Sequence, residues 1–215
     1  MIKQLRPAIM SVLVLTVLTG LIFPMLITAI AQAVFPYQAK GSLVTQGGKV
    51  VGSELIGQNF TAPGYFHPRP SAAGSGYDGA NSSGTNLGPT SSKLIKGIED
   101  DPATKDTDES YSGIPQLAVA YRKENNLTSS TRLPADAVTR SASGLDPHIS
   151  PANDTLQAAR VAKARGLGVD AVKQLVAQNT EGRQFGILGE PRVNVFGLNR
   201  ALDQAAPGKA GKAAA

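Results

Sequence analysis

The sequence predicts an α+β protein, in which one N-terminal transmembrane helix precedes a single extracytoplasmic domain with a small mixed or antiparallel sheet and several short helices. Three observations predict this architecture. Residues 8–35 form an apolar run without a charged residue, which is typical of a helix that spans a bilayer. The roughly 180 residues that follow are enough for one domain with its own core. Within them, short strand-like and helix-like runs alternate with long polar loops.

The apolar run is longer than a bilayer requires. At about 1.5 Å per residue it would extend roughly 40 Å, against a hydrocarbon core of ~30 Å, so a tilted helix is expected. Pro24 is expected to kink it, because proline removes a backbone hydrogen bond. Thr16, Thr19 and Gly20 form a small-residue face that a partner helix could approach closely. The alternative is that this face only meets lipid.

The charge pattern predicts the orientation of the chain in its membrane. Lys3 and Arg6 precede the apolar run, and basic flanks remain in the cytoplasm. Residues 1–7 are therefore expected in the cytoplasm and residues 36–206 outside it, in a single-pass arrangement. Residues 207–215 are rich in alanine and are expected to be a disordered tail.

A cleaved signal peptide is the alternative interpretation of the N-terminus. Ala31, Gln32 and Ala33 match a small-x-small cleavage pattern, and cleavage there would release a secreted ligand-binding domain. The apolar regions of signal peptides are usually about 7–15 residues long, and this run is about twice that length. The sequence therefore favours an uncleaved anchor.

The composition excludes several classes of protein. The chain has no cysteine, which rules out a disulfide framework, a thiolate metal site and a cysteine nucleophile. The net charge is +5, aromatic residues make up 5% and tryptophan is absent. No basic cluster is interleaved with aromatic residues, so nucleic acid is not an expected partner.

Local patterns predict the order of the elements. The clearest helix begins at Ser150-Pro151 and stops at Gly166, which are typical start and stop signals. Residues 52–60 are expected to form a turn or a short helix. The other expected helices contain Leu94, Ile95 and Ile98, then 115–125, then Val172, Leu175 and Val176 facing inward, and finally 199–205. The expected strands are 42–44 and 49–51 as a hairpin around 45–48, then 137–139, 184–188 and 193–196.

Two polar stretches interrupt this pattern. Residues 63–92 show no periodicity, yet they contain Tyr65, Phe66, His67, Arg69, Tyr77 and Asp78. A loop of this length within a domain is typically functional or disordered, and these side chains favour an ordered loop that packs or binds over a flexible insertion. Residues 99–109 are acidic and are expected to form a solvated loop, with a cation-attracting patch as the alternative.

The candidate chemical groups are few. His67, Asp78, Asp146 and His148 could form a two-histidine, two-carboxylate metal site or serve a membrane-anchored hydrolase. No HExxH spacing, GxSxG elbow, phosphate-binding loop or dinucleotide fingerprint supports a reaction. The favoured interpretation is that Asp146 and His148 cap turns and the helix start at Ser150. The chain is then expected to have no catalytic residue, no metal site and no assignable cofactor-binding residue.

Several blocks of sequence resemble the KdpC family, the accessory subunit of the Kdp potassium-transporting P-type ATPase. They begin with the anchor that ends near Phe35-Pro36 and span nearly the whole chain in order. They include VGSELIGQNF (51–60), YFHPRPSAAG (65–74) with Tyr77-Asp78, NLGPT (86–90), SGLDPHISP (143–151), RVAKAR (160–165) and LGEPRVNV (188–195) with Leu198-Asn199. The acidic stretch and the alanine-rich tail depart from the family without touching these blocks.

The resemblance implies a non-catalytic subunit of a high-affinity, ATP-driven potassium uptake complex in the bacterial inner (plasma) membrane. Its partners would be an ion-conducting subunit, an ATP-hydrolysing subunit and membrane lipid, and these subunits rather than this chain would handle ATP and K⁺. The resemblance also implies that it stabilises the assembly and acts as a catalytic chaperone that raises the ATP affinity of the pump subunit. That role conflicts with the predicted topology, because ATP is cytoplasmic.

The topology instead predicts a domain that caps the outer face of the ion-conducting subunit. The expected contact surfaces are the 63–92 loop and the 141–151 loop. The candidate contact residues are Tyr65, His67, Arg69, Tyr77, Asp78, Asp146 and His148.

Overall fold

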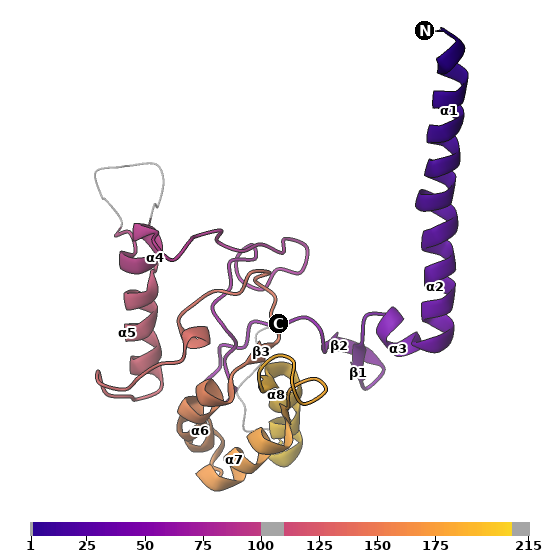
Figure 1. Ribbon diagram of the computed structural model, residues 1–215. Coiled ribbons are helices and arrows are strands. Elements are labelled where there is room, and N and C mark those ends of the chain that lie inside the picture. The colour runs from indigo at the N-terminus through magenta and orange to yellow at the C-terminus, as the bar shows by residue number, and fades with distance from the viewer. Residues whose placement is uncertain (1, 100–109, 208–215) are drawn as a thin grey trace. The chain divides into compact units, whose positions relative to one another are not determined.

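The computed structural model describes residues 2–99 and 110–207, and it divides the chain into two units, Met1–Ser53 and Glu54–Ala215. The predicted tail, apart from Pro207, and the acidic stretch after Glu99 lie outside the described residues. The first unit carries the long apolar helix and a hairpin, and the second carries the remaining strands and helices (Figure 1). The structure therefore has the predicted α+β composition.

The N-terminal helix runs continuously through α1 (Ile2–Val17), a π-helical segment η1 (Leu18–Ile22) and α2 (Phe23–Val34). Lys3–Val34 is the one described helix that is long and apolar enough to span a membrane. The helix therefore starts before the apolar run, and its first turns include the basic residues that were expected to flank it.

The π-helical segment lies directly before Pro24, at the site predicted to be distorted. Proline has no N–H, and its ring clashes with the carbonyl four residues earlier, here that of Gly20. The Phe23 N–H donates to the Leu18 carbonyl, five residues back. The helical turn just before the proline therefore contains one residue more than an α-helical turn. Thr19 Oγ1 donates to the Leu15 carbonyl (2.7 Å), which satisfies its hydroxyl within its own helix.

The predicted hairpin is confirmed. After a short helix, α3 (Pro36–Ala39), β1 (Leu43–Gln46) pairs antiparallel with β2 (Lys49–Ser53). The turn has only two residues, Gly47 and Gly48, with φ values of 57° and 78°. Positive φ at both positions is the requirement of the turn that best matches strand twist, so glycine suits both places.

The second unit is built around a three-stranded antiparallel sheet of very short strands, in the order β3 (His148–Ile149), β5 (Arg192–Asn194) and β4 (Thr180–Glu181). Close to β3 lie three helices, α6 (Pro151–Arg165), α7 (Val169–Gln178) and α8 (Val195–Ala205) (Figure 1). Their buried side chains, together with Phe66, form the main core. Val172 and Val176 are buried in it and Leu175 packs against it, as predicted.

A smaller cluster surrounds α5 (Ile114–Glu124), which packs with α4 (Ser92–Lys96) and a 3₁₀ turn, η2 (Ala135–Ala137). The expected helix through Ile98 is wrong at its end. Gly97 stops α4 with φ of 79°, and Ile98 instead pairs with Tyr111.

Three further predictions of strands are corrected. Residues 137–139 lie in and after η2, because Pro134 starts a turn there. Residues 184–188 form a closed turn with one bridge, between Gln184 and Leu188, rather than a strand. The last strand ends at Asn194, whose side chain accepts a hydrogen bond from Gly197 N (2.9 Å) and so caps α8 earlier than expected.

The start of α6 has two carboxylates with opposite surroundings. Ser150 caps the helix, and its N–H and hydroxyl both donate to Asp136 (2.8 and 2.9 Å), which also accepts from the Asn153 side chain (3.0 Å). Asp154 is fully buried, and neither of its oxygens has a hydrogen-bond partner among the described residues. Burial, with the neighbouring Asp136 charge adding to it, raises the pKa of Asp154 to about 8. The Ser150 cap and the left-handed stop at Gly166 confirm the predicted bounds of this helix.

Candidate functional site

The 63–92 loop is held by side chains from two helices. Phe66 N–H donates to Asn199 Oδ1 (2.8 Å), and the Phe66 carbonyl accepts from Asn199 Nδ2 (3.0 Å). Gln157 makes the same pair of bonds with His67 (2.8 and 3.0 Å). Both amide side chains are buried, so they satisfy a buried backbone that has no neighbouring strand. The loop is thus ordered, as predicted.

Two arginines of α6 complete this frame. Arg160 donates to the carbonyls of Pro63 (2.7 Å) and Tyr65 (2.9 Å). The guanidinium of Arg165, which is fully buried, lies 4.7 Å from the centroid of the Tyr65 ring and pairs with Asp203 (2.9 Å). Tyr65 is therefore a buried part of the frame, and its ring is not an accessible contact.

The two predicted contact loops lie against each other. Ser71 Oγ donates to the Gly144 carbonyl (2.7 Å), which joins the 63–92 loop to the 141–151 loop. At Gly144 φ is 68°, and a Cβ there would lie 2.6 Å from the Ser83 carbonyl oxygen. A larger residue would therefore push the two loops apart.

Four of the candidate residues meet where these loops join. Arg69 Nη1 lies 3.0 Å from Asp146 Oδ2, and the Tyr77 hydroxyl donates to the Arg69 carbonyl (2.8 Å). Asp146 Oδ1 accepts from the His148 N–H (3.0 Å) and so caps a turn, as predicted. The prediction that Asp146 and His148 also cap the helix start is wrong, because Ser150 caps α6 with its own side chain. Burial alone would raise the pKa of Asp146, but its hydrogen bonds with His148 and its pairing with Arg69 hold that pKa below its ordinary value.

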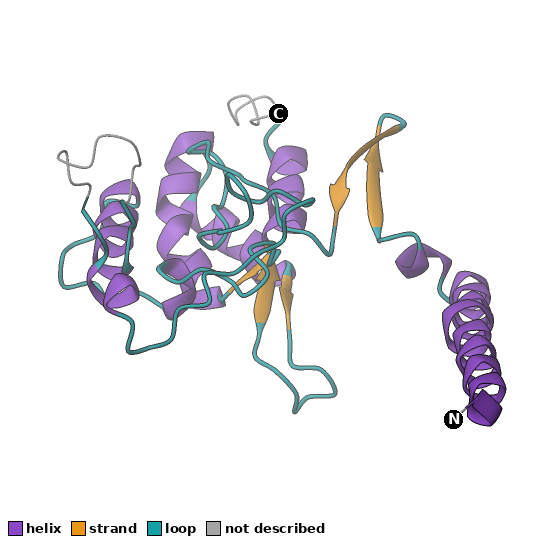
Figure 2. Cartoon of the chain, turned by 90° about the horizontal axis from the view of Figure 1, so that it is seen from above, coloured by secondary structure: helices purple, strands orange, loops and turns teal. Residues whose placement is uncertain are grey.

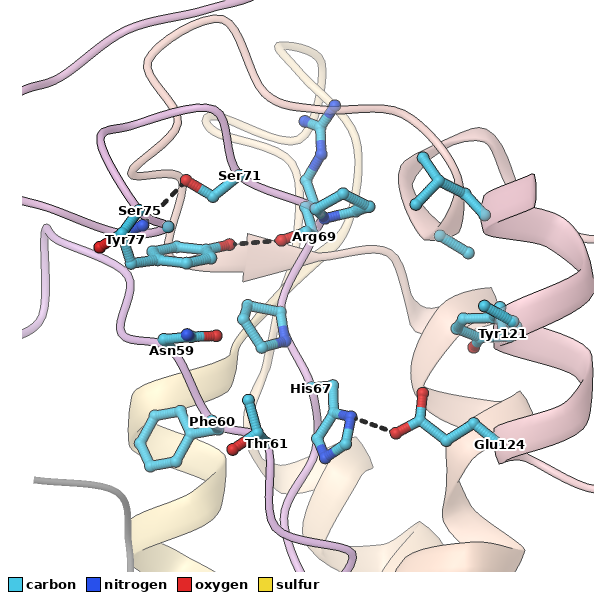
Figure 3. Close-up of a pocket in the computed structure, with 16 residues that line it drawn as sticks. Asn59, Phe60, Thr61, His67, Arg69, Ser71, Ser75, Tyr77, Tyr121 and Glu124 are labelled. Carbon is cyan, nitrogen blue, oxygen red and sulfur yellow. Dashed lines mark hydrogen bonds and ion pairs between the residues drawn. The ribbon is translucent and has the colours of Figure 1, made fainter. Parts of the chain in front are cut away.

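His67 connects the 63–92 loop to α5. Its Nδ1 lies 2.6 Å from Glu124 Oε1, and its Nε2 lies 3.0 Å from the Ala62 carbonyl. Burial would raise the pKa of Glu124, but the hydrogen bond and charge of His67, with the charge of Arg160, hold it below its ordinary value. The pair borders a pocket of about 320 Å³ between the loop and α5 (Figure 3), which is lined by Asn59, Thr61, His67, Tyr77, Tyr121 and Glu124 among others.

The structure does not bring the four candidate metal ligands together. Asp78 closes its own turn by accepting from Ala80 N (2.9 Å) and from the Asn81 side chain. The two histidines contact different carboxylates, since His67 pairs with Glu124 and His148 lies by Asp146. Within the described ranges no group of three His, Asp or Glu side chains is placed to hold a metal ion.

The residues that hold the 63–92 loop in place were not predicted as site residues. These are Glu124, Gln157, Arg160, Arg165 and Asn199. One signal was available in α6, where Asn153, Gln157 and Arg160 follow one another at spacings of four and three and therefore share one helix face. A polar face on a helix that also has an apolar face indicates that the polar side chains bond to another buried segment. Here that segment is the backbone of the 63–92 loop.

Comparison with known proteins agrees with the resemblance. The family described as "KdpC: K+-transporting ATPase, c chain" matches residues 5–204. A "Potassium-transporting ATPase KdpC subunit" of Mycobacterium tuberculosis is 48% identical over 94% of this chain and 98% of its own length. Proteins with the same name from Koribacter versatilis (47%, over 95% and 96%) and Myxococcus xanthus (50%, over 99% and 97%) are similar. Because the family match covers residues 5–204, which include the apolar helix and the 63–92 and 141–151 loops, the chain belongs to the KdpC family, the c chain of the potassium-transporting ATPase.

Proposed function

We propose that the chain is a non-catalytic subunit that stabilises a high-affinity potassium uptake complex from outside the cytoplasm. Its anchor would hold it in the inner membrane, and its domain would cap the outer face of the ion-conducting subunit. The observation that carries the proposal is the single fixed surface formed by the 63–92 and 141–151 loops. A preorganised surface binds a partner without paying the entropy of ordering long loops.

The engagement of the polar side chains supports binding rather than catalysis. Three of the four groups considered for a reaction have structural partners: His67 pairs with Glu124, Asp146 pairs with Arg69, and Asp78 accepts hydrogen bonds within its own turn. A general base needs a free proton-accepting position within reach of a substrate. The same surface offers shape and paired charges, which suit recognition of a protein.

In this proposal ATP and K⁺ are handled by the other subunits. If the chain raises the ATP affinity of the pump subunit, as the resemblance implies, the effect would be transmitted through the membrane-embedded subunits. Coupling of this kind is measured as a change in ATP affinity when the subunit is removed, and it needs no nucleotide contact with this chain.

Photocrosslinking within the intact complex tests the placement of the domain. Photoreactive residues at Ala80 and Ala142, one exposed position in each loop, are expected to capture the ion-conducting subunit, and one at Lys173 on α7 serves as the comparison. Capture only of the cytoplasmic ATPase domain would overturn both the topology and the proposal. A tag on this chain should also co-purify a potassium-stimulated ATPase.

The pocket beside His67 favours an anchored ligand-binding domain or hydrolase as the second candidate, because its volume lies in the range of small-ligand sites. Replacing both histidines by glutamine separates the candidates. Growth on limiting potassium should survive in the double variant H67Q/H148Q if the histidines are structural. Loss of growth with an intact, assembled complex would favour the second candidate.

A further inference from the structure

The loop that joins β4 to β5, residues 182–191, carries the two most exposed large apolar side chains among the described residues of the second unit, and a third that is also exposed. The side chain of Phe185 is 91% exposed, that of Ile187 75% and that of Leu188 54%. Figure 2 shows the connection between the strands of this sheet projecting away from the helices. None of these three side chains belongs to either core cluster, so packing against the core does not explain their position.

The 182–191 loop is nevertheless ordered by its own backbone. Gln184 and Leu188 exchange two hydrogen bonds of 2.9 Å, and Gly186 N donates to the Arg183 carbonyl (3.1 Å). Phe185 has φ of 54°, a conformation that costs an ordinary side chain free energy. A closed loop that holds an exposed phenylalanine in this conformation is preorganised for contact.

The charges at the base of the loop are paired within the chain. Arg183 lies 2.6 Å from Glu190, and Arg192 lies 2.8 Å from Glu181. Surfaces that bind lipid combine apolar side chains with basic groups that attract anionic headgroups. The 182–191 loop instead resembles a protein interface: its aromatic and aliphatic tip corresponds to the apolar centre, and the paired charges at its base correspond to the polar rim.

We propose that the 182–191 loop inserts Phe185, Ile187 and Leu188 into an apolar pocket on another subunit of the potassium-transporting ATPase. The inference rests on the proposed function and adds a contact separate from the 63–92 and 141–151 loops. A protein pocket is the occupant that fits best, because backbone hydrogen bonds close the loop and the charges at its base are paired. The predicted anchor, moreover, already supplies attachment to the membrane.

Photocrosslinking at the tip identifies the occupant directly. Benzoylphenylalanine replaces Phe185 in the full chain, expressed in membranes with the other subunits, and the same residue replaces Val119, an exposed position on α5. The expected result is a crosslink to another subunit from position 185, several-fold stronger than from position 119. A crosslink to lipid or to a second copy of this chain, or no crosslink, would overturn the proposal.

Substitution measures the contribution of the tip. In the double variant F185N/I187S, asparagine suits the positive φ, so the fold should be retained, and V119N is the matched control. Co-purified partner is expected to fall about tenfold or more in the tip variant, as for a central interface residue, and to be unchanged in the control. If the wild-type chain brings down no partner, the proposed function fails. If the tip variant brings down as much as the wild type, only this inference fails.

Discussion

The 63–92 loop is held from outside by buried side chains, whereas the 182–191 loop is held by its own backbone. In the first, the amides of Gln157 and Asn199 take the place of a neighbouring strand. In the second, Gln184 and Leu188 pair with each other, and the side chains at the tip face solvent. The two loops therefore serve different purposes. The 63–92 loop contributes to the core, whereas the 182–191 loop leaves its apolar side chains free to contact a partner.

The two loops are expected to differ in their contribution to stability. Side chains of the 63–92 loop should contribute to the free energy of unfolding, and the exposed side chains at the tip of the 182–191 loop should not. Equal effects from the two loops would contradict this expectation. Each of the following measurements uses urea unfolding of the full chain in detergent.

The largest effect is expected for Phe66→Ala. Phe66 has no exposed surface and lies in the main core with residues of α6, α7 and α8. Removing a buried phenyl ring loses its transfer free energy and leaves a cavity, so the free energy of unfolding should fall by about 3–5 kcal/mol. A loss below about 1 kcal/mol would mean that the 63–92 loop does not form part of the core.

Asn199→Leu tests the amide clamp itself. Leucine fills a similar volume but leaves the N–H and carbonyl of Phe66 buried and unpaired, and each such group costs roughly 1–3 kcal/mol. A destabilisation of about 2–4 kcal/mol is expected. Gln204→Leu makes the same chemical change at an exposed position of α8 and should be close to neutral. Similar losses in both variants would attribute the effect to the leucine rather than to the clamp.

Asp154→Asn tests whether removing the charge of a buried group without a hydrogen-bond partner stabilises the protein, whereas removing the hydrogen-bonded Asn199 amide destabilises it. The pKa of Asp154 is raised to about 8 in the folded protein by burial, so the protonated form is favoured there. Between about pH 4 and pH 8 the folded protein holds a proton that the unfolded chain has lost, and stability falls by up to about 1.4 kcal/mol per pH unit.

The variant should therefore lose this slope and be the more stable protein near about pH 9, by roughly 1–3 kcal/mol. The comparison is Asp170→Asn, the same substitution on the exposed first turn of α7. A variant that is less stable than the wild type across the whole range would indicate that Asp154 has a partner in solution.

The two loops also mark how far the sequence could predict the structure. Local signals were sufficient where one residue decides the backbone, as at Ser150 and Gly166 around α6 and at the Gly47-Gly48 turn. Those signals act over a few residues, so the predicted helix and hairpin are confirmed.

The clamp could not be predicted in the same way, because its partners are far apart in the chain. Asn199 lies 133 residues from Phe66 and Gln157 lies 90 residues from His67. The composition of the 63–92 loop indicated order but not what supplies it. The exposed tip was missed for a different reason. Residues 184–188 were predicted to form a strand, whereas the left-handed conformation of Phe185 closes them into a turn.

The smallest effect is expected for Phe185→Asn, and it decides the comparison. The wild-type ring is 91% exposed, so its removal leaves no cavity, and asparagine adopts positive φ more readily than phenylalanine. The free energy of unfolding should change by less than about 0.5 kcal/mol, as for surface substitutions generally, against several kcal/mol for the phenylalanine at position 66. A loss of about 2 kcal/mol or more in the isolated chain would mean that the tip packs against this chain itself. In that case the 182–191 loop would be part of the fold and would offer no free apolar surface to another subunit.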